Sequence, residues 1–221
     1  MTNSTKRAVQ WILGGIALVL ISKGKRSPAI HTLFQLSPMM GRSVIVWVIF
    51  SLYWAIAAKN SAPTARSESV WSRQFHVVLV NGALLLLVLS VPGLTHRFLP
   101  VSAALEWVGL GIQAAFVLLA IWARRILGSN WSGEVRIATE HRLIQSGPYR
   151  LVRHPIYTAI LGMYFGTMLI SDEIHAPLAL LVITLAYWLK IRLEERALGE
   201  TFGADFDAYR RDTWALVPMV F

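Results

Sequence analysis

The chain alternates between long apolar runs and shorter polar, basic segments, and this alternation predicts a bundle of membrane-spanning helices. A helix crosses a bilayer with roughly 17–25 apolar residues. Six runs are candidates for such spans: Ala8 to Ser22, Ser43 to Ala58, Phe75 to Leu94, Val101 to Ala123, Pro155 to Ser171 and Ala176 to Leu189. The first is short and contains Gly14-Gly15, so we predict an all-α integral membrane protein with five or six transmembrane helices.

The last two runs are predicted to form a helical hairpin. Asp172-Glu173 separates them and is a polar turn at the far side of the membrane. The hairpin returns the chain to the surface that it left after His154. We therefore expect the segment Arg192–Glu195 to lie beside the segment Arg153–Tyr157.

Composition supports a membrane protein and excludes several classes of site. Hydrophobic residues make up 55% of the 221 residues and charged residues 15%, whereas soluble domains carry about a quarter charged residues. The absence of cysteine excludes disulfides, thiolate metal sites and cysteine nucleophiles. The net charge is +9, but most basic residues flank apolar runs. We interpret them as signals for topology and lipid headgroups, not for nucleic acid.

The distribution of Lys and Arg predicts the orientation. From residue 59 onward, fourteen of them fall on the side of the central polar segment 124–154 and one, Arg97, on the other. The positive-inside rule then places the central segment in the cytosol. The basic residues of the first loop do not fit if the first run crosses, so residues 8–42 either span the membrane or lie along its surface. We expect a bacterial inner membrane, or the endoplasmic reticulum in a eukaryote.

Three other patterns have structural interpretations. Gly109-Leu-Gly-Ile-Gln-Ala114 matches the dinucleotide pattern G-x-G-x-x-A, but it lies inside an apolar helix and lacks the preceding strand that the motif needs. Close helix packing explains it better, and the same holds for the small pair Gly162 and Gly166. His141 and His154 lie thirteen residues apart without a third ligand nearby, so we predict no metal site.

Glu194-Glu195 follows directly on the last apolar run. Adjacent helical residues point about 100° apart, so one carboxylate can face a site while the other pairs with Arg192 or Arg196. On its own the pair is also typical of a solvated helix with ion pairs between neighbouring turns. The expected proximity to Arg153-His-Pro-Ile-Tyr157 favours a site.

These two pieces together resemble the signature of the isoprenylcysteine carboxyl methyltransferase family and the related phospholipid methyltransferases. Upstream, His141-Arg-Leu-Ile-Gln-Ser-Gly-Pro-Tyr149 is similar to the family's His-x-Leu-Val segment followed by Gly-Pro-Tyr. Downstream, Phe202-Gly203 and Asp207-Ala-Tyr209 are similar to its C-terminal tail. The resemblance covers about residues 127–214.

The resemblance implies methyl transfer from S-adenosylmethionine at the membrane–cytosol boundary, with the cofactor in a cytosol-facing pocket that is not a Rossmann fold. It implies an N-terminal, acceptor-side region 1–123 and a catalytic region 124–221. Cofactor-binding residues carried over by motif position are His141, Leu143, Ile144, Tyr149, His154, Pro155, Tyr157, Glu194 and Glu195. Glu194 and Glu195 are also the implied catalytic residues, together with Arg192, or Lys190 before it, which orients the substrate.

The acceptor stays open at this point. We expect a lipophilic or lipid-linked acceptor that enters from the bilayer. A carboxylate of the isoprenylcysteine type is the favoured acceptor. A carboxylate is ionised near pH 7 and needs no general base, whereas a phospholipid amine must lose a proton to a glutamate or to His154. The alternative from another class is a non-catalytic membrane subunit for transport or assembly that keeps the same fold.

Overall fold

The computed structural model describes residues 37–57, 66–67, 70–89, 91–128, 136–137 and 143–218. The elements in chain order are α3 (Pro38–Ala57), β1 (Arg66–Ser67), α4 (Val70–Val88), α5 (Ala103–Leu127), β2 (Arg136–Ile137), the 3₁₀ turn η3 (Gly147–Arg150), α6 (Pro155–Ser171), α7 (His175–Phe202) and α8 (Ala204–Asp212). The five long helices α3 to α7 coincide with the predicted runs from Ser43 onward. The run from Ala8 to Ser22 lies outside the described residues.

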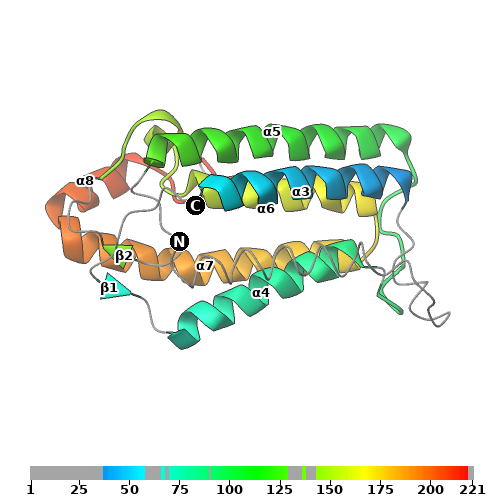
Figure 1. The fold of residues 1–221 in the computed structure, drawn as a ribbon, viewed down its shortest axis with the longest axis horizontal. Helices are drawn as coiled ribbons and strands as arrows, with labels where there is room; N and C mark the ends of the chain where they lie inside the picture. Colours follow the sequence, from blue (N-terminus) through cyan, green and yellow to red (C-terminus); the bar gives the residue numbers. More distant parts are fainter. Residues whose placement is uncertain are drawn as a thin grey trace.

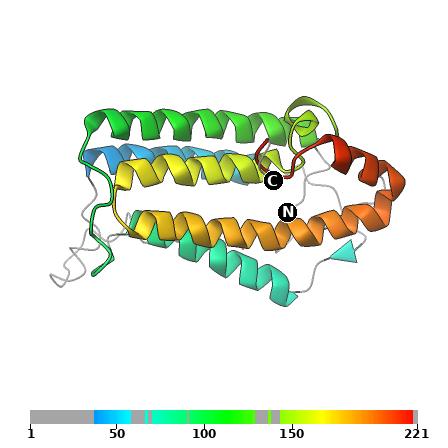
Figure 2. The ribbon, with the colours of Figure 1, turned by 180° about the vertical axis from the view of Figure 1, so that it is seen from behind.

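The long helices form two layers. In Figure 1, α5, α3 and α6 lie together in one layer, and α7 with the inclined α4 forms the other; Figure 2 shows the same layers from behind. α5 packs mainly on α6, and α4 packs mainly on α7. The core between the layers includes Trp47, Leu87, Met163 and Ile183.

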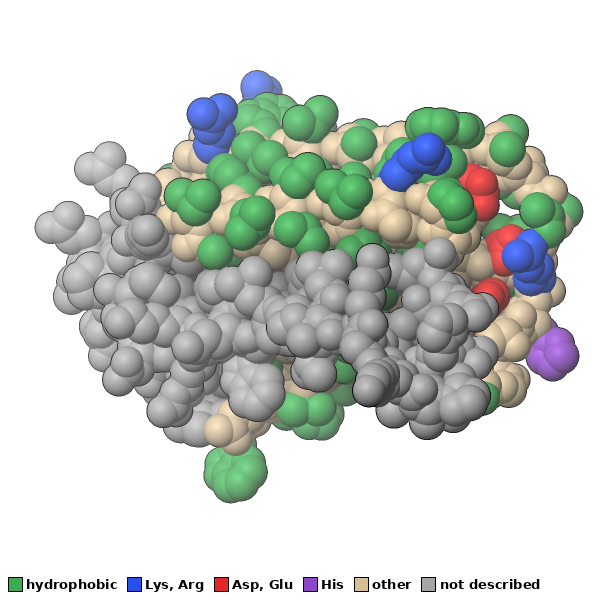
Figure 3. All heavy atoms as spheres, turned by 45° about the vertical axis from the view of Figure 1, so that its right-hand side comes forward, with side chains coloured by type: hydrophobic (Ala, Val, Ile, Leu, Met, Phe, Trp, Pro, Cys, Tyr) green, Lys and Arg blue, Asp and Glu red, His purple; other side chains and the backbone are tan. Residues whose placement is uncertain are grey.

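The outer surface of this bundle is apolar, as a bilayer requires. Ile49, Val78, Leu118 and Leu181 are among the large hydrophobic side chains exposed on its helices. Figure 3 shows hydrophobic side chains spread over the upper part of this face and charged side chains toward its two sides. Among the residues that the structure describes, three helices, α3, α5 and α7, are long and apolar enough to cross a membrane, and two apolar helices are shorter, Gln74–Val88 and α6. The membrane prediction is supported by these helices.

Glycines allow α5 and α6 to approach closely. A Cβ at Gly109 would lie 2.5 Å from the carbonyl oxygen of Gly166, and a Cβ at Gly166 would lie equally close to that of Gly109. The ring of Phe116 occupies the space beside Gly162. The interpretation of these glycines as packing residues is therefore confirmed.

The predicted hairpin is present. α6 ends at Asp172, which adopts a left-handed conformation with φ of 50°. Arg97 pairs with the Asp172 carboxylate at 3.3 Å, and the backbone N–H of Ile174 donates a hydrogen bond to the backbone carbonyl of His96. α7 then runs unbroken for 28 residues, so its charged second half emerges from the bundle beside the N-terminal end of α6.

Two features were not predicted. β1 and β2 pair as a short antiparallel ribbon, with Arg66 opposite Ile137, and strands of two residues are too short to leave a sequence pattern. α5 continues through residue 123, so the predicted boundary between the N-terminal and catalytic regions falls within a helix.

Candidate active site

The segment that follows α8 fixes the backbone around His154. Val152 and Trp214 form a parallel bridge, the Arg153 N–H donates to the Trp214 carbonyl at 2.8 Å, and the His154 N–H donates to Ala215 at 3.1 Å. Pro155 begins α6, where a missing backbone donor costs nothing. The His154 side chain is therefore held, nearly fully buried, at the N-terminal end of α6.

Glu194 lies beside this helix end. Its Oε1 accepts a hydrogen bond from the Tyr157 hydroxyl at 2.6 Å, and its Oε2 lies 3.5 Å from His154 Nδ1. The carboxylate side chain is 20% exposed. The hairpin geometry predicted from the sequence is thus confirmed at atomic distances.

Glu195 has different partners. Arg153 Nε donates to its Oε1 at 2.7 Å, His154 Nε2 lies 3.3 Å from the same oxygen, and Arg210 Nε lies 3.8 Å from Oε2. Pairing with Arg192 or Arg196 was the wrong expectation. Arg153 precedes α6 and Arg210 belongs to α8. The ion pairs of Glu195 with these two residues therefore link α8 to the α6–α7 hairpin.

His154 bridges the two carboxylates. Burial by itself lowers the pKa of His154, but hydrogen bonds and charge interactions with Glu194 and Glu195 outweigh it and raise the pKa above its ordinary value. The imidazole is therefore stabilised as a cation between two anions.

An aromatic column adjoins the carboxylates. The ring of Tyr157 stacks on His154 at 5.7 Å and on Tyr187 at 4.4 Å, with interplanar angles of 11° and 19°. A partly buried carboxylate beside aromatic rings attracts cations. The arrangement is suited to a positively charged ligand group.

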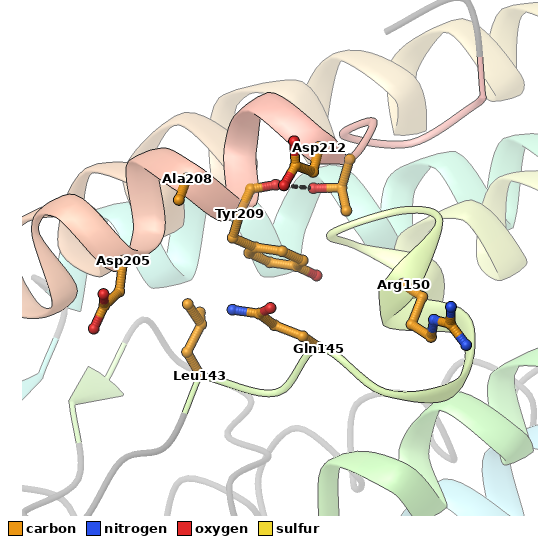
Figure 4. Close-up of a pocket in the computed structure, with 8 residues that line it drawn as sticks. Leu143, Gln145, Arg150, Asp205, Ala208, Tyr209 and Asp212 are labelled. Carbon is orange, nitrogen blue, oxygen red and sulfur yellow. Dashed lines mark hydrogen bonds between the residues drawn. The ribbon is translucent and has the colours of Figure 1, made fainter.

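An open cavity of about 560 Å³ lies at the same end of the bundle, between the segment 143–150 and α8. It is lined by Leu143, Gln145, Arg150, Asp205, Ala208, Tyr209, Asp212 and Thr213. In Figure 4, Leu143 and Gln145 face Ala208 and Tyr209 across it. Arg153 donates to the carbonyl of Thr213, so the cavity and the carboxylate cluster share a wall.

Tyr209 holds the two walls of the cavity together. Its hydroxyl donates to the carbonyl of Tyr149 at 2.7 Å. Burial raises the pKa of Tyr209 to about 12, so the hydroxyl keeps its proton near neutral pH. The glycine before α8 makes this contact possible, because Gly203 has a positive φ of 51° that turns the chain back after α7.

The structure brings most of the predicted residues to this end of the bundle. Glu194, Glu195, His154 and Tyr157 form one contact cluster, Leu143 lines the cavity, Ile144 and Tyr149 pack with Ile156 beside them, and Pro155 is buried at the start of α6. His141 lies outside the described residues.

Arg192 is not brought to the cluster. It precedes Glu194 by two residues, about 200° around the helix, and its guanidinium lies over the ring of Trp188 at 4.6 Å on the exposed side. Lys190, in contrast, is 6% exposed. The spacing of these residues along the helix is enough to predict that Lys190 lies on the same face of α7 as Glu194 and that Arg192 does not.

Sequence reasoning missed three further residues near the cluster. Arg153 was recognised within the motif but not as the partner of Glu195, and Arg210 was not considered. His76 of α4 contacts Tyr187 at 5.5 Å. No spacing along the chain relates α4 to α7, so no sequence signal indicated this contact.

Comparison with known proteins finds a matching family model and similar sequences. The family model described as phospholipid methyltransferase matches residues 105–205. A probable protein-S-isoprenylcysteine O-methyltransferase of Oryza sativa subsp. indica is 31% identical over 99 residues, which cover 42% of this chain and 50% of that protein. The nickel-cobalt-cadmium resistance protein NccN of Alcaligenes xylosoxydans xylosoxydans is 36% identical over 123 residues, covering 53% and 52%. The chain spans about half the length of these curated relatives.

A solved structure of a eukaryotic intramembrane Ras methyltransferase, isoprenylcysteine carboxyl methyltransferase, has the same fold. It aligns with 100% of this chain and 99% of its own, with a TM-score of 0.50 and 16% sequence identity. The chain is thus similar to phospholipid methyltransferases and protein-S-isoprenylcysteine O-methyltransferases in its sequence, and to an isoprenylcysteine carboxyl methyltransferase in its fold.

Proposed function

We propose that this protein is an S-adenosylmethionine-dependent methyltransferase that methylates the carboxylate of a lipophilic acceptor of the isoprenylcysteine type at the membrane–cytosol interface. The observation that carries the proposal is the partly buried carboxylate of Glu194 beside the stacked rings of Tyr157 and Tyr187. This is a binding site for an organic cation, formed where the family's motifs meet.

The chemistry of the lining residues fits this cofactor. Its sulfonium and ammonium are cations, for which Glu194 and the aromatic column are suitable neighbours. The adjoining cavity has a size typical of small-molecule sites and polar walls that include Gln145, Arg150 and Asp205. When bound, S-adenosylmethionine supplies an electrophilic methyl group.

The proposed roles of the protein's own residues follow from their contacts. Glu194 binds the ammonium of the cofactor, and the Tyr157 hydroxyl holds the Glu194 carboxylate in place. Glu195 neutralises Arg153 and His154 and keeps the helix end in place. Leu143, Ile144 and Tyr149 form the remaining walls. Arg192 is not included among these residues, because it lies over Trp188 on a face of α7 that points away from Glu194.

The reaction then depends on alignment more than on proton transfer. A carboxylate acceptor is already ionised near pH 7. Its oxygen forms a bond to the methyl carbon while the carbon–sulfur bond breaks, the electron pair stays on sulfur, and no proton has to be removed. The protein's contribution is to hold the two reactants in line and to exclude water.

The surroundings of the site suggest its orientation. Exposed basic side chains lie at this end of the molecule, on the second half of α7 and on α8: Arg192, Arg196, Arg210 and Arg211. The positive-inside rule favours the cytosol for them. The acceptor then reaches the site laterally from the cytosolic leaflet.

Calorimetric titration of S-adenosylhomocysteine into the folded, detergent-purified protein tests the proposal. Methyl transfer from labelled S-adenosylmethionine to N-acetyl-S-farnesylcysteine is measured beside it. We expect saturable binding and formation of the methyl ester. Absence of binding by protein with a cooperative unfolding transition would refute the methyltransferase function and favour a non-catalytic membrane subunit.

A further inference from the structure

The lipid-facing surface of α5 lies between two exposed tryptophans. Trp107 is near the start of the helix and Trp122 near its end, and both side chains are more than half exposed. Tryptophan concentrates at the level of the lipid headgroups, because its ring is apolar and its N–H is polar. The two residues are fifteen positions apart, which corresponds to about 22 Å along a helix. This distance is shorter than the hydrocarbon core of an ordinary bilayer, which is about 30 Å thick.

Arginines beside two of the exposed tryptophans mark the same boundaries. At the end of the bundle that carries Asp172, the guanidinium of Arg42 on α3 lies 5.4 Å from the ring centroid of Trp107. At the end that carries the carboxylate cluster, the guanidinium of Arg192 on α7 lies 4.6 Å from the ring centroid of Trp188. A charged side chain is costly within the hydrocarbon core. Both arginines therefore indicate levels at which the headgroups begin.

The length of α6 sets an upper limit on the thickness of the apolar region. This helix has 17 residues, which correspond to about 26 Å. His154 precedes it directly and Asp172 follows it directly. His154 belongs to the carboxylate cluster, and Asp172 pairs with Arg97. Polar groups thus stand at both ends of a helix that is shorter than an ordinary bilayer core.

The second layer of helices has an apolar surface of the same length. On α7 the exposed leucines extend from Leu178 to Leu193, which are fifteen positions apart and about 22 Å along the helix. Tilt does not lengthen such a surface, because it shortens the projection of a helix on the bilayer normal. The inclined α4 in Figure 1 is an example.

We propose that this bundle matches a bilayer whose hydrocarbon core is about 22–26 Å thick, and that its lipid-facing surface binds phospholipids with short acyl chains in preference to long ones. In a thicker bilayer, the apolar surface ends before the acyl chains do. The neighbouring lipids must then compress, or polar groups at the helix ends must enter the hydrocarbon, and each adjustment has a cost. The inference uses only the outer surface of the bundle and is independent of the methyltransferase function.

A bilayer of this thickness brings the lipid headgroups level with the carboxylate cluster. Glu194 directly follows Leu193, the last exposed leucine of α7, and His154 lies at the corresponding end of α6. An amphipathic molecule whose polar group lies among the headgroups then reaches the cluster without leaving the membrane. In an ordinary bilayer the cluster would lie about 2–4 Å deeper than the headgroups of its leaflet.

Reconstitution of the full-length protein in vesicles of different thickness tests the proposal. The probes are fluid, monounsaturated phosphatidylcholines with acyl chains of about 14 to about 22 carbons. We expect the thermal midpoint to be highest at about 14–16 carbons and about 5 °C or more lower at about 22 carbons. Quenching of tryptophan fluorescence by brominated forms of the same lipids measures their relative affinities, and the short-chain lipids should bind about twofold or more tightly.

Two substitutions lengthen the apolar surface at the end near the carboxylate cluster. Arg125→Leu extends α5 beyond Trp122, Arg192→Leu extends α7 beyond Trp188, and both arginines are exposed. Together they add about one helical turn in each layer, so the double variant should shift the optimum to longer chains by about two carbons or more. Arg211→Leu is the matched control, because it removes the same charge from an exposed position on α8 and should leave the optimum unchanged.

The wild-type profile alone decides the matter if the double variant does not fold. An optimum at about 18 carbons or longer, or equal affinities for short and long lipids, overturns the inference. A folded double variant that keeps the wild-type optimum overturns it as well. The same holds if Arg211→Leu shifts the optimum as far as the double variant, because loss of charge would then explain the shift.

Discussion

Replacing Glu194 by glutamine removes the negative charge of the proposed cofactor site while keeping the shape of the side chain. The amide oxygen of a glutamine can still accept the hydrogen bond that the Tyr157 hydroxyl donates at 2.6 Å. The loss therefore concerns the charge seen by a cationic ligand group more than the packing of α7 against α6.

The size of the effect follows from the burial of this carboxylate. Its side chain is 20% exposed, so water screens a bound ammonium only partly. A hydrogen bond to a charged group contributes about 1.5–3 kcal/mol. Glu194→Gln should therefore raise the dissociation constant of S-adenosylhomocysteine by about 10- to 150-fold. Calorimetric titration of the detergent-purified protein measures this change.

Glu195→Gln should behave differently, and the contrast makes the test specific. Glu195 accepts from Arg153 at 2.7 Å, and the two side chains are 13% and 9% exposed. Breaking a buried ion pair leaves a cation without its partner and costs about 3 kcal/mol or more in stability. We expect a lower thermal midpoint for Glu195→Gln and a dissociation constant within about threefold of the wild-type value in protein that is still folded.

Glu200→Gln is the matched control, since Glu200 is exposed on the same helix and its replacement should change neither quantity. The reasoning is refuted if Glu194→Gln binds S-adenosylhomocysteine with wild-type affinity. It is also refuted if Glu195→Gln loses affinity at an unchanged thermal midpoint, because Glu195 would then be the residue that binds the ligand.

Three further predictions concern the scaffold of the site. Gly109→Ala should lower the thermal midpoint through overpacking of about 1–3 kcal/mol against Gly166, whereas Gly111→Ala, with no atom within 4 Å of the added Cβ, should leave it unchanged; equal midpoints would contradict the close approach of α5 and α6. Because the folded pKa of His154 is raised, its stabilising contribution is complete below the unfolded value near 6.5 and is lost as pH rises through the folded value. The thermal midpoint of ligand-free protein should thus decrease as the pH rises above about 6.5, and the same decrease in His154→Gln would argue against this origin. Tyr209→Phe removes a buried hydrogen bond and should cost about 1 kcal/mol of stability and weaken binding in the adjoining cavity; unchanged midpoint and affinity would contradict its role.

The helices and their hairpin were predictable because a bilayer imposes both length and apolarity on a span. The turn at Asp172 was predictable for the same reason, since charged residues there end one apolar run before the next begins. The meeting of Glu194 with Tyr157 followed from the hairpin alone, because two helices joined by a short turn bring their open ends to one surface.

Partners supplied by other elements were not predictable in this way. Glu195 pairs with Arg153 and with Arg210 because α8 folds back after Gly203, a tertiary event that the helical spacing of α7 does not contain. Arg192 lies two residues before Glu194 and so on another face of α7, where it contacts Trp188; its role in orienting the substrate stays a prediction.

The residues around the carboxylate cluster come from two parts of the chain, and the sequence resemblance covers only one of them. The residues that surround the proposed cofactor position lie between 143 and 214, within the stretch that carries the family motifs, and nearly all are held by contacts within that stretch. His76 belongs to α4, outside both the motifs and the matched residues 105–205, and it joins the site only because α4 packs against α7.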